Sequence, residues 1–339
     1  MLRTLLVSVT AALLFTTAVR AADKPLSAAA QVAQMKRGVN IVGYDPLWRD
    51  ASQARFKPRH FKIIKDGGFD HVRFNLYAFR RMDQVLHLDP AWLDTLDALV
   101  DQALDQNLQV VLDLHDYEKC ADDTGRCRDQ VLAFWTQIAQ RYRKSPSTVL
   151  FEILNEPNGK MDAEWNALLA DALAVIRKTN PTRNVVIGPA FWNNVTHLPQ
   201  LELPKADRHI IVTVHYYLPM RFTHQGARWV PEYTNVSGVT WGTPEEHAAL
   251  DQDFDAVQAW AKQHERPILL GEFGAYDKAP MESRVKYTAA VARAAEARGW
   301  AWSYWQFDSD FVAYFIDKDE WNVPIRDALI PAANGTARD

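Results

Sequence analysis

The sequence lacks most of the features that would place it in a specialised protein class. Its 339 residues include only two cysteines and no CxxC or HxxxH spacing, which disfavours a structural metal site. The formal net charge is −4, so the basic excess of nucleic-acid-binding proteins is missing, and we expect no nucleic-acid partner. No Gly/Ser-rich linker interrupts residues 37–335. What remains is the ordinary composition of a globular protein, 48% hydrophobic and 24% charged.

Long apolar runs are also scarce, and the clearest one lies at the N-terminus. Arg3 precedes the mostly apolar residues 5–19, and a small-residue cleavage site follows. A membrane anchor is the alternative, but the run is shorter than the ~20 residues that a spanning helix needs. We therefore predict a signal peptide over residues 1–21 and a linker over 22–36. The mature protein would be secreted or periplasmic, with no membrane attachment.

The two cysteines, Cys120 and Cys127, are separated by six residues. Export favours an oxidised pair that closes a small loop between them. Two free thiols are the alternative. A metal site that recruits the nearby His115 and Asp122 is less favoured, because no second ligand spacing accompanies them.

The rest of the chain alternates between two kinds of pattern. Short apolar, β-rich runs predict eight strands, at 37–43, 69–75, 108–115, 148–155, 184–190, 209–217, 266–273 and 300–307. Amphipathic patterns predict long helices between them, at 89–107, 129–144, 162–180, 243–264 and 283–299. Eight strands alternating with helices predict a single α/β domain over residues 37–335, a closed (β/α)₈ TIM barrel.

Polar side chains gather where these strands end. In a (β/α)₈ barrel the C-terminal strand ends form one mouth, which is the active-site face. Each residue could be an unrelated polar cap, but unrelated caps need not be so rich in carboxylate, imidazole and indole. The residues concerned are Arg73, Asn75, His115, Asp116, Asn155, Glu156, His215, Tyr217, Glu272, Trp305 and Gln306.

Two carboxylates among these residues, Glu156 and Glu272, suit glycoside hydrolysis. One must be protonated to donate to the leaving oxygen, and the other must be ionised to attack the sugar or to activate water. A metal site built from both carboxylates with His115 and His215 is the alternative. The 12 Trp, 11 Tyr and 15 Phe residues favour a sugar cleft, because aromatic faces stack on pyranose rings. We therefore expect no metal and no cofactor.

Two motifs on the fourth and seventh predicted strands resemble a known family. "ILNEPNG" and "LLGEFG" are similar to glycoside hydrolase family 5, the cellulase family, over roughly residues 36–335. The resemblance implies a retaining mechanism, with Glu156 as acid/base, Glu272 as nucleophile and carboxyl groups about 5 to 5.5 Å apart. Arg73 would help to keep Glu272 ionised, because a nearby cation favours a carboxylate. Tyr217 would donate a hydrogen bond to the nucleophile.

The resemblance also implies how the sugar is held. Asn155 would hydrogen-bond the sugar 2-hydroxyl. His115 and His215 would line the subsite of the reacting sugar, and Trp305 would form its platform. The long insert 218–243 is similar to loops of bacterial β-1,4-glucanases, and its Trp229 and Trp241 would shape the cleft.

Together these features predict an exported retaining endo-β-1,4-glucanase that acts as a monomer on a polysaccharide or oligosaccharide. The alternatives are the same mechanism on β-1,3-glucan, β-mannan or xyloglucan, and a glycan-binding barrel without catalysis. One carboxylate, Glu152, lies inside the fourth predicted strand. It would face a neighbouring strand or the helical layer, and the sequence assigns it no catalytic role.

Overall fold

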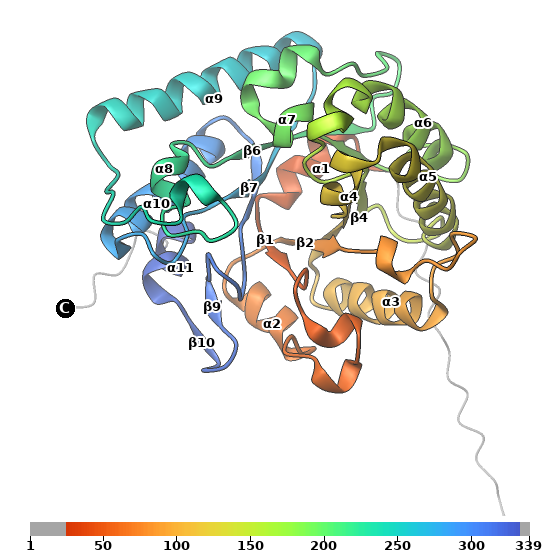
Figure 1. Ribbon diagram of the computed structural model, residues 1–339, viewed down its shortest axis with the longest axis horizontal. Helices are drawn as coiled ribbons and strands as arrows, with labels where there is room; N and C mark the ends of the chain where they lie inside the picture. Colours follow the sequence, from red (N-terminus) through yellow and green to blue (C-terminus); the bar gives the residue numbers. More distant parts are fainter. Residues whose placement is uncertain (1–24, 333–339) are drawn as a thin grey trace, which may run out of the picture.

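The computed structural model of the protein describes residues 25–332, which fold into a closed eight-stranded parallel barrel. Figure 1 shows the strands inside a ring of helices. Each strand pairs with its neighbours in sequence order, and β8 returns to β1 to close the barrel. The strands are β1 (Arg37–Ile41), β2 (His71–Leu76), β3 (Gln109–Leu114), β4 (Val149–Glu152), β5 (Val185–Ile187), β6 (Ile210–Tyr216), β7 (Ile268–Phe273) and β8 (Ala301–Tyr304).

The helices follow the amphipathic patterns of the sequence. In α3, Asp89 caps the first turn by accepting from the Ala91 amide, and Pro90 occupies the first helical position, where its missing N–H is harmless. The α-helices are α1 (Ala28–Met35), α2 (Arg59–Asp66), α3 (Pro90–Asp105), α4 (Tyr117–Asp122), α5 (Thr124–Arg141), α6 (Trp165–Arg177), α7 (Ala190–Asn193), α8 (Met220–Thr223), α9 (Pro244–His264), α10 (Met281–Ala297) and α11 (Val323–Leu329).

Short elements fill the loops. The 3₁₀ turns are η1 (Pro46–Trp48), η2 (Ala51–Gln53), η3 (Phe79–Arg81), η4 (Gly159–Ala163), η5 (Val195–Gln200) and η6 (Pro231–Tyr233), and β9 (Tyr314–Phe315) pairs with β10 (Glu320–Trp321). The eight predicted strands and five predicted long helices are thus confirmed. After β5 the chain forms only α7 and η5 before β6, so this crossover lacks a long helix. None of the helices between residues 25 and 332 is long and apolar enough to cross a membrane.

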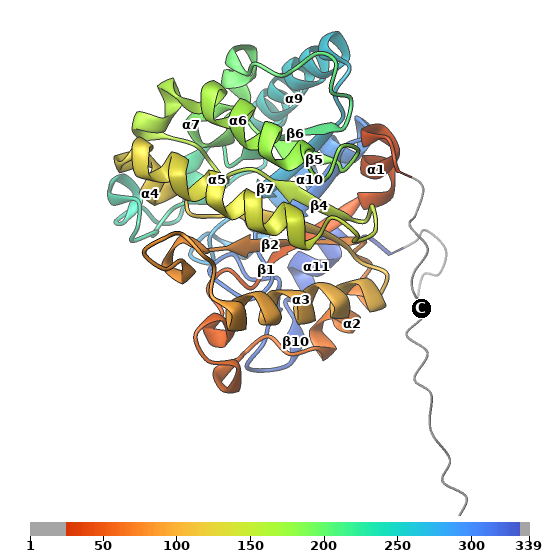
Figure 2. The ribbon, with the colours of Figure 1, turned by 90° about the vertical axis from the view of Figure 1, so that its right-hand side faces the viewer.

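The predicted linker over residues 22–36 is wrong for most of its length. Helix α1 forms there, and Val32 and Met35 are buried. Figure 2 places α1 at one end of the barrel, with α4 and α7 at the other. Gln31 anchors the helix by hydrogen bonding Gln109 inside the barrel. The helix closes an apolar cluster made of Ala28, Val32, Met35, Val111, Leu150, Val186, Ile211, Leu269 and Ala301. The predicted signal peptide lies outside the described residues.

A break in the β6–β7 register changes which side chains face the barrel interior. Val214 pairs with Leu270, but the next residue, His215, pairs with Glu272, so Gly271 is an extra residue in β7. A Cβ at Gly271 would lie 2.5 Å from the Thr213 hydroxyl, which explains why glycine occupies the bulge. The bulge turns the Glu272 side chain inward, although strict alternation with Leu270 would place it outside.

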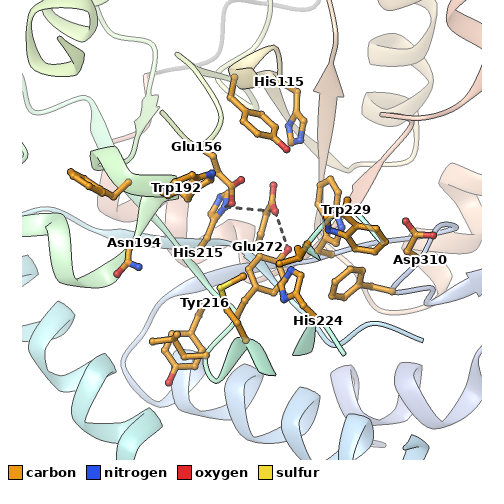
Figure 3. Close-up of a pocket in the computed structure, with 18 of the residues that line it drawn as sticks. His115, Glu156, Trp192, Asn194, His215, Tyr216, His224, Trp229, Glu272 and Asp310 are labelled. Carbon is orange, nitrogen blue, oxygen red and sulfur yellow. Dashed lines mark hydrogen bonds and ion pairs between the residues drawn. The ribbon is translucent and has the colours of Figure 1, made fainter. Parts of the chain in front are cut away.

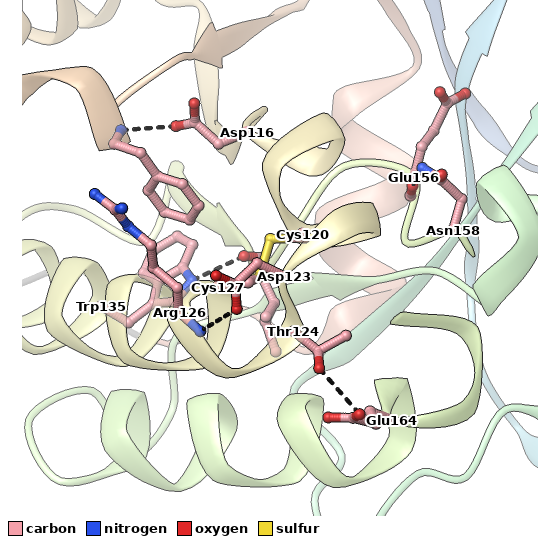
Figure 4. Close-up of a disulfide and its surroundings, with 12 residues drawn as sticks. Asp116, Cys120, Asp123, Thr124, Arg126, Cys127, Trp135, Glu156, Asn158 and Glu164 are labelled. Atoms are coloured by element: carbon pink, nitrogen blue, oxygen red, sulfur yellow. Dashed lines mark hydrogen bonds between the residues drawn. A yellow bond between two sulfur atoms is a disulfide. The ribbon is translucent and has the colours of Figure 1, made fainter. Parts of the chain in front are cut away.

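Cys120 and Cys127 form a disulfide, as the sequence analysis expected for an exported chain. Figure 4 shows that the bond joins α4 to the first turn of α5, close to the loop that carries Glu156. Both cysteines are buried, and Asp123 caps α5 between them by accepting from the Arg126 amide. The disulfide therefore fixes the segment that follows β3 on the active-site side of the barrel.

Candidate active site

The C-terminal ends of the strands open into a cleft of about 750 Å³. Figure 3 shows Glu156, His215 and Glu272 at its base, with aromatic side chains around them. The lining residues come from seven of the eight strand ends and from the 218–243 insert. They include Tyr44, His115, Tyr117, Glu118, Glu156, Phe191, Trp192, His215, Tyr217, His224, Trp229, Glu272, Trp305, Asp310 and Phe311.

Glu272 is held by one cation and one phenol. Arg73 Nη1 donates to its Oε1 at 2.8 Å, and the Tyr217 hydroxyl donates to its Oε2 at 2.9 Å. Both carboxylate oxygens therefore accept a hydrogen bond, and one of these bonds is charge-assisted. Donors of this kind stabilise the ionised carboxylate, which is the form that a nucleophile requires.

Glu156 lies in a different environment. Its backbone has φ 42°, a left-handed conformation that is costly for a residue with a side chain. The Glu156 Oε1 atom lies 2.7 Å from His215 Nδ1. Burial raises the pKa of Glu156 to about 7 and lowers the pKa of His215 to about 4. Near neutral pH the imidazole is therefore uncharged, and Glu156 is poised between its acid and base forms.

The two carboxylates face each other across a short gap. A carboxylate oxygen of Glu156, one of Glu272 and a ring nitrogen of His215 all lie within 4.8 Å of one another. Inverting glycosidases keep their carboxyl groups about 6.5–9.5 Å apart to admit a water, whereas retaining enzymes keep them about 5–5.5 Å apart. The short separation matches the retaining arrangement.

These three side chains could also offer ligands to a metal ion. Their existing hydrogen bonds compete with that role. The oxygens of Glu272 already accept from Arg73 and Tyr217, and His215 Nδ1 is directed at Glu156. A positive guanidinium bound to one ligand also disfavours a second cation beside it. The donor set therefore suits a carboxylate pair better than a metal centre.

Arg73 and Asn155 lie below the cleft and do not line it. Arg73 is fully buried and donates to Asn155 Oδ1 at 2.7 Å. It also forms a bidentate pair with Glu152, at 2.7 and 2.9 Å. Glu152 therefore faces the barrel interior. Its expected positions were against a neighbouring strand or against the helical layer, and neither position fully describes the observed one. The predicted contact of Asn155 with a sugar hydroxyl stays a prediction.

A second charged pair supports the cleft wall. His115 Nδ1 lies 2.5 Å from Asp113, which is also 3.1 Å from Arg73 Nη2. Burial would lower the pKa of His115, but the Asp113 carboxylate outweighs burial and raises it. The His115 ring stacks on Trp305, with centroids 5.5 Å apart and planes 8° apart. The stacked pair forms one aromatic wall of the cleft beside the carboxylates.

Only one of the two tryptophans predicted in the long insert reaches the cleft. Trp229 lines it and is 51% exposed. The prediction for Trp241 is wrong, because this side chain is 4% exposed and packs edge-on against Tyr287. Its backbone N–H donates to the Ser283 hydroxyl on α10, which fixes the end of the insert. Trp241 therefore anchors the loop that presents Trp229.

Several aromatic residues of the cleft were not predicted from the sequence. Phe191 and Trp192 line it, and they are 40% and 51% exposed. They follow β5 in a run of left-handed residues, with φ 56° and 58°, that continues through Asn193. Tyr44, which follows β1, is 58% exposed and contacts Trp305 edge-on. Reading the ends of the first and fifth strands for aromatic residues would have identified all three.

Comparisons with known proteins agree with this geometry. The profile described as Cellulase (glycosyl hydrolase family 5) matches residues 32–310. Endoglucanase H of Acetivibrio thermocellus is 30% identical over 88% of this chain, which spans 33% of that relative. Endoglucanase 3 of Fibrobacter succinogenes is 27% identical over 82% of this chain, which spans 50% of its length. The chain thus spans between a third and a half of the length of these two curated relatives.

Solved structures also resemble the chain. Cel5A of Thermotoga maritima, solved with mannotriose, superimposes with a TM-score of 0.85 and is 37% identical. The match covers 89% of this chain and all of that protein, which has also been solved with cellobiose. The barrel, the carboxylate pair and these matches support one assignment. The chain belongs to glycosyl hydrolase family 5, the cellulase family.

Proposed function

We propose that the protein is an endo-β-1,4-glucanase that cleaves by double displacement. The observation that carries this proposal is the carboxylate pair. Glu156 and Glu272 lie within 4.8 Å of each other, yet only Glu272 is bound to a cation, while burial raises the pKa of Glu156 to about 7. Two carboxyl groups in such different environments can take the roles of acid and nucleophile at one pH.

In the first step, the Glu272 carboxylate attacks the anomeric carbon while Glu156 donates its proton to the departing glycosidic oxygen. The product is a glycosyl ester on Glu272, and Glu156 is left ionised. In the second step, Glu156 removes a proton from water, whose oxygen attacks the anomeric carbon and releases Glu272. The short hydrogen bond to His215 orients Glu156 during both proton transfers.

The walls of the cleft favour a neutral glycan. Among the described lining residues, none is lysine or arginine, and the charged groups outside the catalytic pair include Glu118 and Asp310. A glycan that carries uronic acids would be repelled by these carboxylates. Exposed aromatic faces supply the alternative mode of binding, because they stack on uncharged pyranose rings.

The positions of the aromatic residues support cleavage within a chain. Figure 3 shows Trp192 on one side of the carboxylate pair and Trp229 on the other. Both indoles are half exposed, and the backbone of Trp192 is held in a left-handed conformation. Platforms on both sides of the reacting bond allow a polysaccharide to extend past it in both directions. We therefore propose endo action.

β-Mannan is the second candidate substrate. The support is the solved relative from Thermotoga maritima, which binds mannotriose as well as cellobiose. Glucose and mannose units differ in the orientation of the 2-hydroxyl. The family resemblance assigns the contact with this hydroxyl to Asn155, so we expect this side chain, whose Oδ1 atom accepts from Arg73, to read the difference.

A panel of purified polysaccharides tests the proposal. Reducing ends released from β-1,4-glucan, β-mannan, xyloglucan and β-1,3-glucan should be highest for β-1,4-glucan. Viscosity should fall early in that reaction, since internal cleavage shortens chains before many ends appear. Higher activity on mannan would select the second candidate. Inactivity on the whole panel, with the protein folded by circular dichroism, would contradict the enzyme proposal and favour a binding barrel.

We also propose that the protein is exported and acts as a monomer. Export rests on residues 1–21, which lie outside the described residues, and is supported by the buried disulfide, a bond typical of oxidising compartments. Every cleft residue named above comes from one chain, so a single copy suffices for the proposed reaction. Mass spectrometry of the mature N-terminus and light scattering would test these two points.

A further inference from the structure

Glu152 is a fully buried carboxylate next to the catalytic pair, and the mechanism above does not use it. It is the last residue of β4 and points into the barrel two residues after Leu150. It does not line the cleft, so it cannot touch a substrate. A buried carboxylate is costly unless it is paired, and its partner here is Arg73.

The pair between Glu152 and Arg73 fixes the direction of the guanidinium. Arg73 Nε and Nη2 donate to the two oxygens of Glu152, at 2.7 and 2.9 Å. This two-point contact fixes the plane of the Arg73 guanidinium. The remaining nitrogen, Nη1, is thereby aimed at Glu272 Oε1, 2.8 Å away, and at Asn40 Oδ1. The orientation of Glu152 therefore determines how the nucleophile is held.

The same pair also controls the charge near the nucleophile. One guanidinium faces three carboxylates, since Asp113 and Glu272 contact Arg73 as well. An ionised Glu152 offsets part of the positive charge of Arg73 and repels the ionised Glu272 carboxylate. Formation of the glycosyl ester removes the charge of Glu272 and relieves this repulsion. The second step restores the charge and so meets the repulsion again.

We propose that Glu152 is a positioning residue for the first chemical step, which aims Arg73 at Glu272 and uses its own charge to favour attack by the nucleophile. This inference rests on the proposed function, because it requires Glu272 to be the nucleophile. The groups that face Glu152 are Arg73 from β2, Asp113 from β3 and Glu272 from β7, with His115 behind Asp113.

The effect should depend on pH. Burial raises the pKa of Glu152 to about 7, although Arg73 opposes the shift. Below that pH, wild-type Glu152 gains a proton and resembles glutamine. The Glu152→Gln variant should therefore match the wild type near pH 5.5 and fall behind by about tenfold in kcat/KM near pH 8. A structural role would instead produce the same loss at every pH.

The assay uses aryl β-cello-oligosaccharides. The ratio of wild-type to variant kcat/KM reports the first step, and kcat with a dinitrophenyl leaving group reports hydrolysis of the ester. We expect Glu152→Gln to slow the first step and to leave the second unchanged or faster. Glu152→Asp keeps the negative charge but moves it away from Arg73, because the aspartate side chain is one methylene shorter. The rates of this variant should fall, and their pH dependence should stay that of the wild type. The matched control is Asp207→Asn, which breaks the bidentate pair with Arg177 away from the cleft. This variant should change the rate of neither step.

A pH-independent ratio, or equal losses in both steps, would overturn the inference. If Glu152→Gln does not fold, the wild type still provides a test by ¹³C NMR of labelled glutamate. Trapping Glu272 as a 2-fluoroglycosyl ester should move the titration of Glu152 to lower pH, and no movement would overturn the inference. A wild type that is inactive, or that carries no label on Glu272, would instead contradict the proposed function.

Discussion

The two halves of the barrel interior are built from the same strands but carry opposite kinds of side chain. Towards the N-terminal ends, apolar residues pack against α1 in a buried cluster. Towards the C-terminal ends, Arg73 lies among three carboxylates. On the inner face of β4, the side chains change from apolar to charged between two successive inward-facing residues, Leu150 and Glu152. The apolar half offsets the cost of burying charge in the catalytic half.

Backbone strain occurs at both ends of the barrel. The left-handed residues Lys36, Asn107 and Glu265 precede strands at the N-terminal end, whereas Glu156, Phe191, Trp192 and Asn193 lie at the catalytic end. Such conformations cost roughly 1–3 kcal/mol each and persist only where surrounding structure enforces them. The comparison teaches that changes in the apolar half should alter stability alone, whereas changes in the charged half should alter catalysis. Substitutions in either half test this division.

The largest expected effect is on the charged side. Glu156→Gln removes the proposed proton donor and should lower kcat/KM for unactivated β-1,4-gluco-oligosaccharides by about 10²- to 10⁴-fold. The loss should be much smaller for aryl glycosides with good leaving groups, which need little protonation. Glu202→Gln, at an exposed carboxylate, is the matched control and should retain full activity. Equal losses on both substrates would show that Glu156 is not the acid.

The next effect is on the apolar side. Leu150→Ala leaves a cavity beneath the charged cluster and should lower the free energy of unfolding by about 2–5 kcal/mol. Because Leu150 lies in the apolar cluster with α1 and lines no part of the cleft, kcat/KM at 25 °C should stay within about twofold of the wild type. Denaturant titration and steady-state kinetics provide the two values. A large kinetic loss in a folded variant would break the proposed division.

The third effect is a pH dependence. Burial raises the pKa of Glu156 to about 7, and the first step needs its protonated form. In the Glu152→Gln variant, which lacks the ionisation of Glu152, kcat/KM should therefore be level below pH 7 and fall about tenfold per pH unit above it. In the wild type, ionisation of Glu152 favours the first step over the same range, so the fall should begin at a higher pH. A pH profile with an unactivated oligosaccharide measures this limb. Leu150→Ala should keep the limb in place, whereas Glu156→Gln should abolish it.

The smallest effect concerns the two tryptophans of the insert. Trp229→Ala removes an exposed sugar platform and should raise KM by about five- to tenfold, with kcat less affected, if stacking contributes about 1 kcal/mol. Trp241→Phe is the control, because it conserves the aromatic packing of a buried anchor and should leave KM unchanged. An unchanged KM in Trp229→Ala would remove this residue from the binding surface.

Much of the fold could be predicted from the sequence, because apolar runs and amphipathic helices have distinct periods. Helix α1 could not, since its short, alanine-rich segment forms a helix through the burial of Val32 and Met35 in the barrel. The inner face of a strand is also hidden when both faces are buried. This explains why the environment of Glu152 was not foreseen.

The site was predictable where strand ends coincide with motifs. Glu272 reaches the cleft only through the bulge at Gly271, which a two-residue period does not reveal. The error at Trp241 has a similar cause, since aromatic content does not separate a buried anchor from an exposed platform. The left-handed backbone of Phe191 and Trp192 likewise depends on tertiary contacts, such as the bond from the Trp192 N–H to the Pro157 carbonyl.

The measurement that tests the central claim most directly is azide rescue of Glu272→Ala. The alanine removes the carboxylate but leaves space for a small anion near Arg73 and Tyr217. With an activated aryl β-glycoside, azide should restore turnover and yield the α-glycosyl azide, the product of one inversion. Glu156→Ala with azide should yield the β-anomer instead, through the glycosyl ester. A β-glycosyl azide from Glu272→Ala would contradict the assignment of Glu272 as the nucleophile.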